Sequence, residues 1–348
     1  MSTLDWIIFI VAAIVFVITG LSILYNMAKG GHHKTNLTDK FVWGINTQIF
    51  YALSSFGTGL MVVMSAIILL VGTEFLYSIL QAGNSIAFAC VLSGVIQMGI
   101  DLGKPQRAMK VLFGKKFNSP LTIDFIALTV LMILSIIFIV GMGSASLAAL
   151  KIWAYLTTLI SVLCMSTHTL LIASRFEPGF RSNPFHSAET FVCSIWSGLA
   201  IMTLLSLGNP LTEVFVKMLL VFSAASLIKG ISSVIALNLG KSEIHTHKKA
   251  FILLSAITFI ILVIGDLAAI RQGGLVIVAC LLTLAAVIVE KGASVIVVQK
   301  RPVIPAPYNK FDPKERYVPS KTEIGYLLFS IALIAVIPYG VFLIGFGA

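Results

Sequence analysis

The chain has little charge for its length, and this scarcity decides its class. Only 11% of its 348 residues are Asp, Glu, Lys or Arg, whereas a soluble domain carries about 25%. Hydrophobic residues make up 58% of the chain, and the mean hydropathy is +1.02. The composition excludes a soluble enzyme or a nucleic-acid-binding domain. It predicts an all-α integral membrane protein, with lipid and no nucleic acid around it.

Cysteine is also sparse, and its placement argues against a metal or disulfide framework. The four cysteines lie inside apolar runs without any C-x-x-C spacing: Cys90, Cys164, Cys193 and Cys280. Histidine is scarce in the apolar runs as well, because His168 is the only one of six that lies far from a loop or interface. Bis-histidine ligation of a haem needs two facing histidines. We therefore expect no metal, haem or iron–sulfur cluster in this chain.

Long apolar runs are what the chain has in abundance. A membrane-spanning helix needs roughly 20 apolar residues. Ten runs qualify: 3–26, 43–72, 79–100, 120–142, 149–173, 187–208, 212–238, 250–270, 273–298 and 322–346. The sequence predicts a single polytopic membrane domain over 1–348. Helices two to five (43–173) and six to nine (187–298) are expected to form two four-helix bundles, flanked by the first and tenth helices.

The basic residues gather on alternate loops. Five loops hold 19 of the 24 Lys and Arg residues: 27–42, 102–119, 174–186, 239–249 and 300–321. The loops between them are nearly free of basic residues, so the alternation supports a count of ten helices. By the positive-inside rule, the basic loops face the cytoplasm and both termini face outward from the cell membrane. Docking of an acidic partner on these loops is the alternative explanation of their charge.

Four polar residues from four consecutive predicted helices fall at one depth. Asn46 lies near the start of the second helix, Asp101 closes the third, Asp124 lies one turn into the fourth, and His168 lies near the end of the fifth. At about 1.5 Å of rise per residue, all four fall in the leaflet next to the basic loops. Ionisable groups in a membrane are costly and usually face the bundle interior. They form a candidate proton-handling site, although capping or backbone hydrogen bonds would explain each one singly.

A second pair of ionisable residues lies in the later bundle. Lys229 and Glu290 are each 17 residues from their predicted helix starts, which places opposite charges at one depth. A buried ion pair would lower the cost of both. The pair is either a structural clamp or part of a proton path. Glu189, at the start of a helix, is expected to be solvated.

Several motifs resemble one family of membrane proteins. They are FVWGIN (41–46), DLGKP (101–105), NSPLTID (118–124), the stretch 184–198 and the stretch 317–323. In this order they are similar to the NrfD/polysulfide-reductase family over about 40–346. The additional first helix makes the chain more similar to the ten-helix branch, found in alternative complex III and in hydrogenase- and sulfite-reduction-linked complexes.

The resemblance implies a role in electron transfer. Members of this family exchange electrons between membrane quinones and a docked four-cluster ferredoxin-like iron–sulfur subunit, with a further catalytic subunit, for example of molybdopterin type, behind it. It implies a site for menaquinone or another quinone in the first bundle, at Asn46, Asp101 and Asp124. His168 joins this set by depth alone. Quinone reduction adds two protons with two electrons, which histidine and carboxylates can deliver.

Two alternatives stay open at this point. A function of a different class is an ion-translocating or secondary-transporter subunit that uses Lys229 and Glu290. Transporters often break helices with Gly or Pro near the midplane, and Pro338 is the only proline in the middle of a predicted helix, which disfavours this reading. The second open question is which way the protein is oriented in the membrane. In many members of the family the partner docks on the outer face, over loops equivalent to the basic loops of this chain. The charge of those loops here predicts that they face the cytoplasm.

Overall fold

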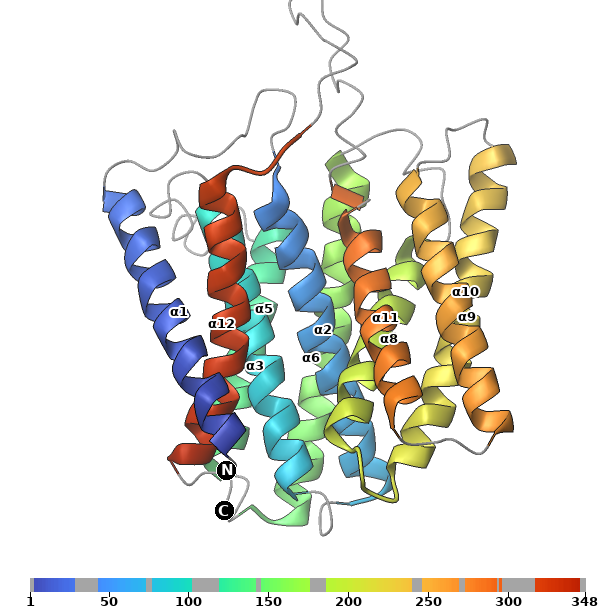
Figure 1. Cartoon of the computed structure of the whole chain (residues 1–348), viewed down its shortest axis with the longest axis horizontal. Helices are drawn as coiled ribbons and strands as arrows, with labels where there is room; N and C mark the ends of the chain where they lie inside the picture. The colour runs from blue at the N-terminus through green and yellow to red at the C-terminus, as the bar shows by residue number, and fades with distance from the viewer. Residues whose placement is uncertain are drawn as a thin grey trace, which may run out of the picture.

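Ten long α-helices make up the part of the chain that the computed structural model describes (Figure 1). That part comprises residues 3–28, 43–72, 77–101, 119–141, 145–175, 186–239, 246–268, 273–292, 294–295 and 317–344. The helices are α1 Thr3–Ala28, α2 Ile45–Leu70, α3 Tyr77–Asp101, α5 Pro120–Gly141, α6 Leu147–Arg175, α8 His186–Leu205, α9 Thr212–Leu239, α10 Thr246–Leu267, α11 Gly274–Gly292 and α12 Lys321–Leu343. All ten are long and apolar enough to cross a membrane. The protein is a multi-pass all-α membrane protein, and the predicted number of spans is confirmed.

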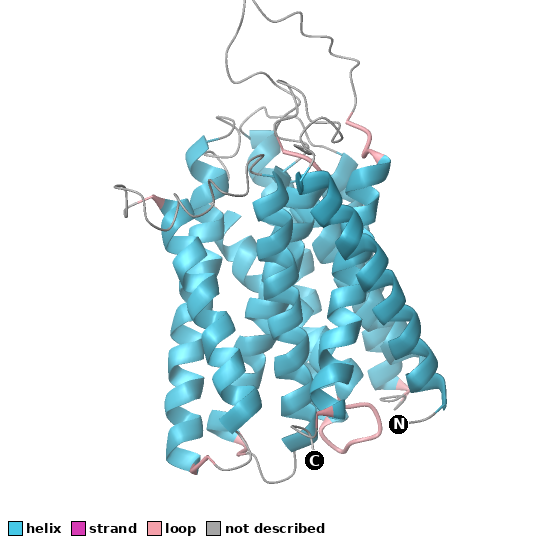
Figure 2. Cartoon of the chain, turned by 90° about the vertical axis from the view of Figure 1, so that its left-hand side faces the viewer, coloured by secondary structure: helices cyan, strands magenta, loops and turns pink. Residues whose placement is uncertain are grey.

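The helices stand side by side (Figures 1 and 2). Successive helices alternate in direction (Figure 1). As a result, α1 begins at the end of the molecule where α12 finishes (Figure 1). Helices α2, α5, α8, α10 and α12 all begin at the opposite end. We call this the basic-loop end, because the sequence segments that join the helices there hold most of the Lys and Arg residues.

Two rings of four helices form the body of the protein. Helices α2, α3, α5 and α6 pack around one another as the first bundle, and α8, α9, α10 and α11 pack as the second bundle. Helices α1 and α12 pack together, and α12 packs on α3. Both outer helices therefore lie beside the first bundle rather than one beside each bundle (Figure 1).

Helix α2 is the central element of the fold. Twenty of its 26 residues are buried, and it contacts α3 and α6 in the first bundle and α8 and α11 in the second. A Cβ atom on Gly59 would lie 1.7 Å from the Ser194 carbonyl oxygen of α8, and one on Gly198 would lie 2.3 Å from the Gly59 carbonyl carbon. Only glycine permits two helix backbones to approach so closely. The two bundles are thus joined through backbone contact.

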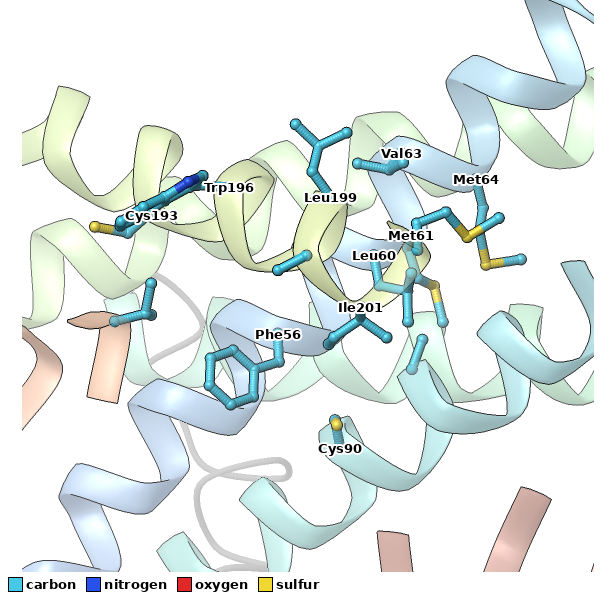
Figure 3. Packing of buried hydrophobic residues seen from close by; sticks show 14 of the residues in the cluster. Phe56, Leu60, Met61, Val63, Met64, Cys90, Cys193, Trp196, Leu199 and Ile201 are labelled. Atoms are coloured by element: carbon cyan, nitrogen blue, oxygen red, sulfur yellow. The ribbon is translucent and has the colours of Figure 1, made fainter. Parts of the chain in front are cut away.

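Large side chains fill the space around this crossing (Figure 3). Phe56 and Leu60 of α2 and Trp196 and Leu199 of α8 belong to one buried cluster. Trp196 is fully buried, and its indole Nε1 donates to Ser223 Oγ of α9 at 3.1 Å. Because its one polar group has a partner, the tryptophan can fill the core without a desolvation penalty.

Helix α12 is tied to the first bundle by polar contacts. Gln97 Nε2 of α3 donates to the Tyr326 carbonyl oxygen at 2.6 Å. Just before α12, the Tyr317 hydroxyl donates to Glu323 Oε1 at 2.6 Å and accepts from the Ile45 backbone N–H at 2.9 Å. Tyr317 thereby satisfies a free donor at the start of α2. It fixes the turn of α2 that carries one of the candidate site residues.

Candidate functional site

The first bundle contains a buried histidine–carboxylate pair near the basic-loop end. His168 Nε2 of α6 lies 3.2 Å from Asp124 Oδ1 of α5, and neither side chain is more than 2% exposed. The Thr167 hydroxyl donates to the same carboxylate oxygen at 2.6 Å. A buried carboxylate is costly unless neighbours donate to it or pair with it. The sequence placed His168 and Asp124 at a similar depth, and in the structure their side chains lie next to each other. Thr167 contacts the same carboxylate and was not predicted from the sequence.

Helix α2 supplies the other wall around His168. The ring centroids of Phe50 and Tyr51 lie 5.5 and 5.4 Å from the imidazole centroid, both edge-on to it. Asn46 is fully buried and lies one helical turn before Phe50, on the same face of α2. Asn46, a predicted site residue, therefore lies one turn closer to the basic-loop end than the aromatic pair that contacts His168.

Asp101 ends α3 at the basic-loop end, the same end at which Asn46 and Asp124 lie. Its side chain is outside the residues that the structure describes. A partner is expected to dock over loops 102–119 and 174–186, and of these loops segments 102–118 and 176–185 are also outside the described residues. The contribution of Asp101 to a site therefore stays a prediction.

Several hydroxyls of the first bundle are fully buried without a hydrogen-bond partner among the described residues: Ser54, Ser55, Ser93, Thr157 and Ser161. Ser54 follows Phe50 by one turn, and Ser161 precedes His168 by two turns. A buried polar atom without a partner costs about 1–3 kcal/mol. These hydroxyls continue the polar surroundings of His168 deeper into the bundle, and they suit a ligand that carries hydrogen-bonding oxygens.

Replacing Thr167 with Val is expected to destabilise the protein by about 1–3 kcal/mol, because the buried Asp124 carboxylate loses a donor while the side-chain shape is kept. The free energy of unfolding in mixed micelles measures this effect. Thr129→Val on α5 is the matched control, since the Thr129 hydroxyl bonds only the Phe125 carbonyl of its own helix. Equal effects of the two substitutions would contradict a special role for the Thr167 contact.

The second bundle holds a larger group of buried charges, which we call the charge cluster. Its members come from all four helices and are between 2% and 8% exposed: Glu189, Lys229, Lys248, Glu290 and Lys291. Lys248 Nζ pairs with Glu189 Oε1 and lies 3.0 Å from Glu290 Oε1. Lys229 Nζ lies 3.4 Å from Glu189 Oε1. Two lysines and two glutamates therefore form a continuous ion-pair network.

Two expectations from the sequence are corrected here. Lys229 and Glu290 share the cluster, but Lys229 pairs with Glu189, and Glu290 pairs with Lys248. The expectation that Glu189 is solvated is wrong, because it is 2% exposed and accepts from Lys248. The physical reason is that α8 and α10 begin at the level where α11 ends, so their first turns face its last turn. Lys248 was counted in the basic loop 239–249, and only its position in α10 shows that it is buried.

No family model matches the chain. None of the curated proteins matches it either. The likeness to the NrfD/polysulfide-reductase family therefore rests on the sequence motifs, and any function proposed from it rests on those motifs together with the geometry described above.

Proposed function

We propose that this protein is the quinone-reactive membrane subunit of a respiratory oxidoreductase, similar to the ten-helix branch of the NrfD/polysulfide-reductase family. The observation that carries the proposal is the buried His168–Asp124 pair. It lies against two aromatic rings, in a bundle that also holds buried hydroxyls without partners. A quinone has a flat ring and two carbonyl oxygens that accept hydrogen bonds. Apolar walls with a few polar groups are typical of sites for such ligands.

The residues of this site have separable tasks. A bound quinone supplies two-electron redox chemistry that is coupled to two protons. His168 is the group that gives or takes a proton at one carbonyl oxygen, through Nδ1, because its Nε2 faces Asp124 and an imidazole can act as both acid and base. Asp124, held by Thr167, fixes the orientation of the imidazole. The Asn46 amide is the candidate donor to the other carbonyl, and Phe50 and Tyr51 keep water from the histidine.

The electrons are proposed to come through a partner protein. The four cysteines of this chain are buried, free thiols that lie on four different helices, which does not match the clustered ligands of iron–sulfur proteins. A ferredoxin-like iron–sulfur subunit is therefore proposed to dock over the basic-loop end, with a further catalytic subunit behind it. The charge bias assigns this end to the cytoplasm and both termini to the outside of the cell membrane.

Purification of the protein from its native membrane through an affinity tag tests the proposal. We expect an iron–sulfur protein to co-purify, a lipid quinone to be extractable from the complex, and cross-links from Lys115 and Lys116, outside the described residues, to reach the partner. A complex that contains no iron and whose activity persists unchanged in quinone-free vesicles would contradict the proposal.

A further inference from the structure

The start of helix α2 depends on a residue that comes much later in the chain. The N-cap of α2 is Gly44, which has no side chain that could accept a hydrogen bond from the first turn. The first N–H groups of a helix have no partner within the helix, and a side-chain oxygen of the N-cap residue usually satisfies one of them. In α2 an acceptor comes from the Tyr317 hydroxyl, 272 positions after Ile45, which lies 2.9 Å from the Ile45 nitrogen. Tyr317 therefore caps α2 from another segment.

The Tyr317 hydroxyl is itself held in place by a buried carboxylate. It donates to Glu323 Oε1 at 2.6 Å, while the Ser320 backbone N–H donates to Glu323 Oε2 at 2.7 Å. The Ser320 hydroxyl accepts from the Glu323 N–H at 3.2 Å, which completes a capping box at the start of α12. Glu323 is fully buried. Because both of its oxygens are engaged, the carboxylate cannot turn away from Tyr317.

Helix α12 gives this contact a fixed base in the first bundle. Gln97 Nε2 of α3 donates to the Tyr326 carbonyl oxygen at 2.6 Å and to Ser330 Oγ at 2.7 Å. These two bonds hold the second and third turns of α12 against α3. A series of hydrogen bonds and helix contacts therefore leads from α3 through α12 and Tyr317 to the first residue of α2.

The residue that follows Ile45 is Asn46, the proposed donor to one quinone carbonyl. Asn46 is fully buried, but it lies in the first turn of α2, and the ends of helices open more readily than their interiors. His168 and Asp124 lie on α6 and α5, and their side chains are 3.2 Å apart. A loosened start of α2 would therefore displace Asn46 and leave the histidine–carboxylate pair where it is.

We propose that Tyr317 is a positioning residue of the quinone site. Its hydroxyl fixes the first turn of α2, so that the Asn46 amide is held where it donates to a quinone carbonyl. Such a donor has to stay within about 0.5 Å of its productive position. Tyr317 acts through Asn46, and it therefore sets the affinity for the quinone rather than the rate of proton transfer. The inference rests on the proposed function, because Asn46 has this task only if the first bundle binds a quinone.

The test compares the native purified complex with Tyr317→Phe, Asn46→Leu and the double variant. Phenylalanine keeps the ring and removes the bridging hydroxyl, and leucine keeps a similar shape and removes the amide. One quantity to measure is the Kd of menadione, a naphthoquinone without an isoprenoid tail, by equilibrium dialysis in mixed micelles. The other is kcat with its reduced form, menadiol. Decylubiquinone replaces menadione if the native complex binds it more tightly.

We expect Tyr317→Phe to raise Kd about tenfold, the effect of one well-placed hydrogen bond. It should change kcat by less than about twofold, because His168 and Asp124 do not depend on the first turn of α2. Asn46→Leu should raise Kd by about as much or more. Adding Tyr317→Phe to Asn46→Leu should then change Kd by less than about twofold, since two residues that act on one contact are not additive.

Tyr339→Phe is the matched control for the loss of the hydroxyl. Tyr339 belongs to the same helix, α12, and its hydroxyl also bonds a carboxylate, that of Asp5. Asp5 lies in the first turn of α1, at the end of the molecule opposite the basic-loop end (Figure 1). Kd and kcat of the Tyr339→Phe complex should therefore equal those of the native complex.

The outcomes distinguish failure of the inference from failure of the proposed function. An unchanged Kd in Tyr317→Phe overturns the inference and leaves the proposed function standing. The inference is also overturned if the effects of Tyr317→Phe and Asn46→Leu multiply, or if Tyr339→Phe weakens binding equally. A native complex that binds neither menadione nor decylubiquinone overturns the proposed function itself. If Tyr317→Phe fails to assemble, Glu323→Gln carries the same expectations, because its amide has one acceptor oxygen where the carboxylate has two.

Discussion

Replacing His168 with Ala is expected to lower quinone turnover by about 10²–10⁴-fold, the usual contribution of a positioned general acid or base. The loss follows from the geometry, because His168 is the group paired with Asp124 inside the first bundle. Assembly and partner docking should persist, since the substitution leaves the helix contacts of α2, α5 and α6 in place. Turnover per assembled complex, with reduced quinone analogue as substrate, is the quantity to measure.

Two further variants make this test sharper. Asp124→Asn keeps the shape of the carboxylate but cannot ionise, so it should lower turnover more mildly and shift the pH optimum. Leu170→Ala is the control, because Leu170 lies on the same helix with 54% of its surface exposed. If His168→Ala lowers protein abundance but leaves turnover per complex unchanged, His168 is a packing residue. The site would then have to be rebuilt around Asp101 and Asn46.

Replacing Gly198 with Ala is expected to cost more than about 3 kcal/mol of stability, at the upper end of the effects of overpacking. The added Cβ would lie 2.3 Å from the carbonyl carbon and 2.5 Å from the carbonyl oxygen of Gly59. Backbone atoms cannot swing away as a flexible side chain can, so α8 would have to move off α2. The free energy of unfolding in mixed micelles and the yield of monodisperse protein report the loss.

Gly99→Ala on α3 is the matched control for this substitution. Nothing lies within 4 Å of the position that its Cβ would take, and alanine is favoured over glycine in a helix by about 1 kcal/mol. The control should therefore be neutral or slightly stabilising. Similar stability of the Gly198→Ala and Gly99→Ala proteins would show that the bundles are not joined by backbone contact.

The fold could be predicted because each spanning helix must satisfy its own backbone in lipid. Each span therefore needs a continuous run of apolar residues long enough for one helix, and such runs can be counted in the sequence. All ten predicted runs correspond to helices. The ends are less well defined by apolarity. The sixth run continues to residue 208, whereas α8 ends at Leu205, and just beyond it the Ser206 carbonyl accepts from the hydroxyl of Thr212, which begins α9. Such an end depends on a neighbouring helix, which a count of apolar residues does not include.

The His168–Asp124 pair could be predicted from the sequence more fully than the charge cluster could. Asp124 and His168 stand alone in long apolar runs, so their depth could be read directly. Thr167 could not be singled out, because buried threonines are common in this chain and only the fold aims this one at a carboxylate. Glu189 and Lys248 lie in first turns of helices, where the sequence resembles a solvated interface. Their burial depends on how three helices meet.

The central position of α2 has a consequence for how the chain is made. Helix α2 is synthesised early, but its neighbours α8 and α11 begin roughly 140 and 230 residues later. At about 5–20 residues per second, Gly59 and the other small residues of α2 wait on the order of 10 s before the helix that covers them emerges. Meanwhile this face has only lipid or the insertion machinery against it. The first bundle is therefore synthesised before the packing around α2 can be completed. That packing finishes only when α8 and α11 of the second bundle have been synthesised.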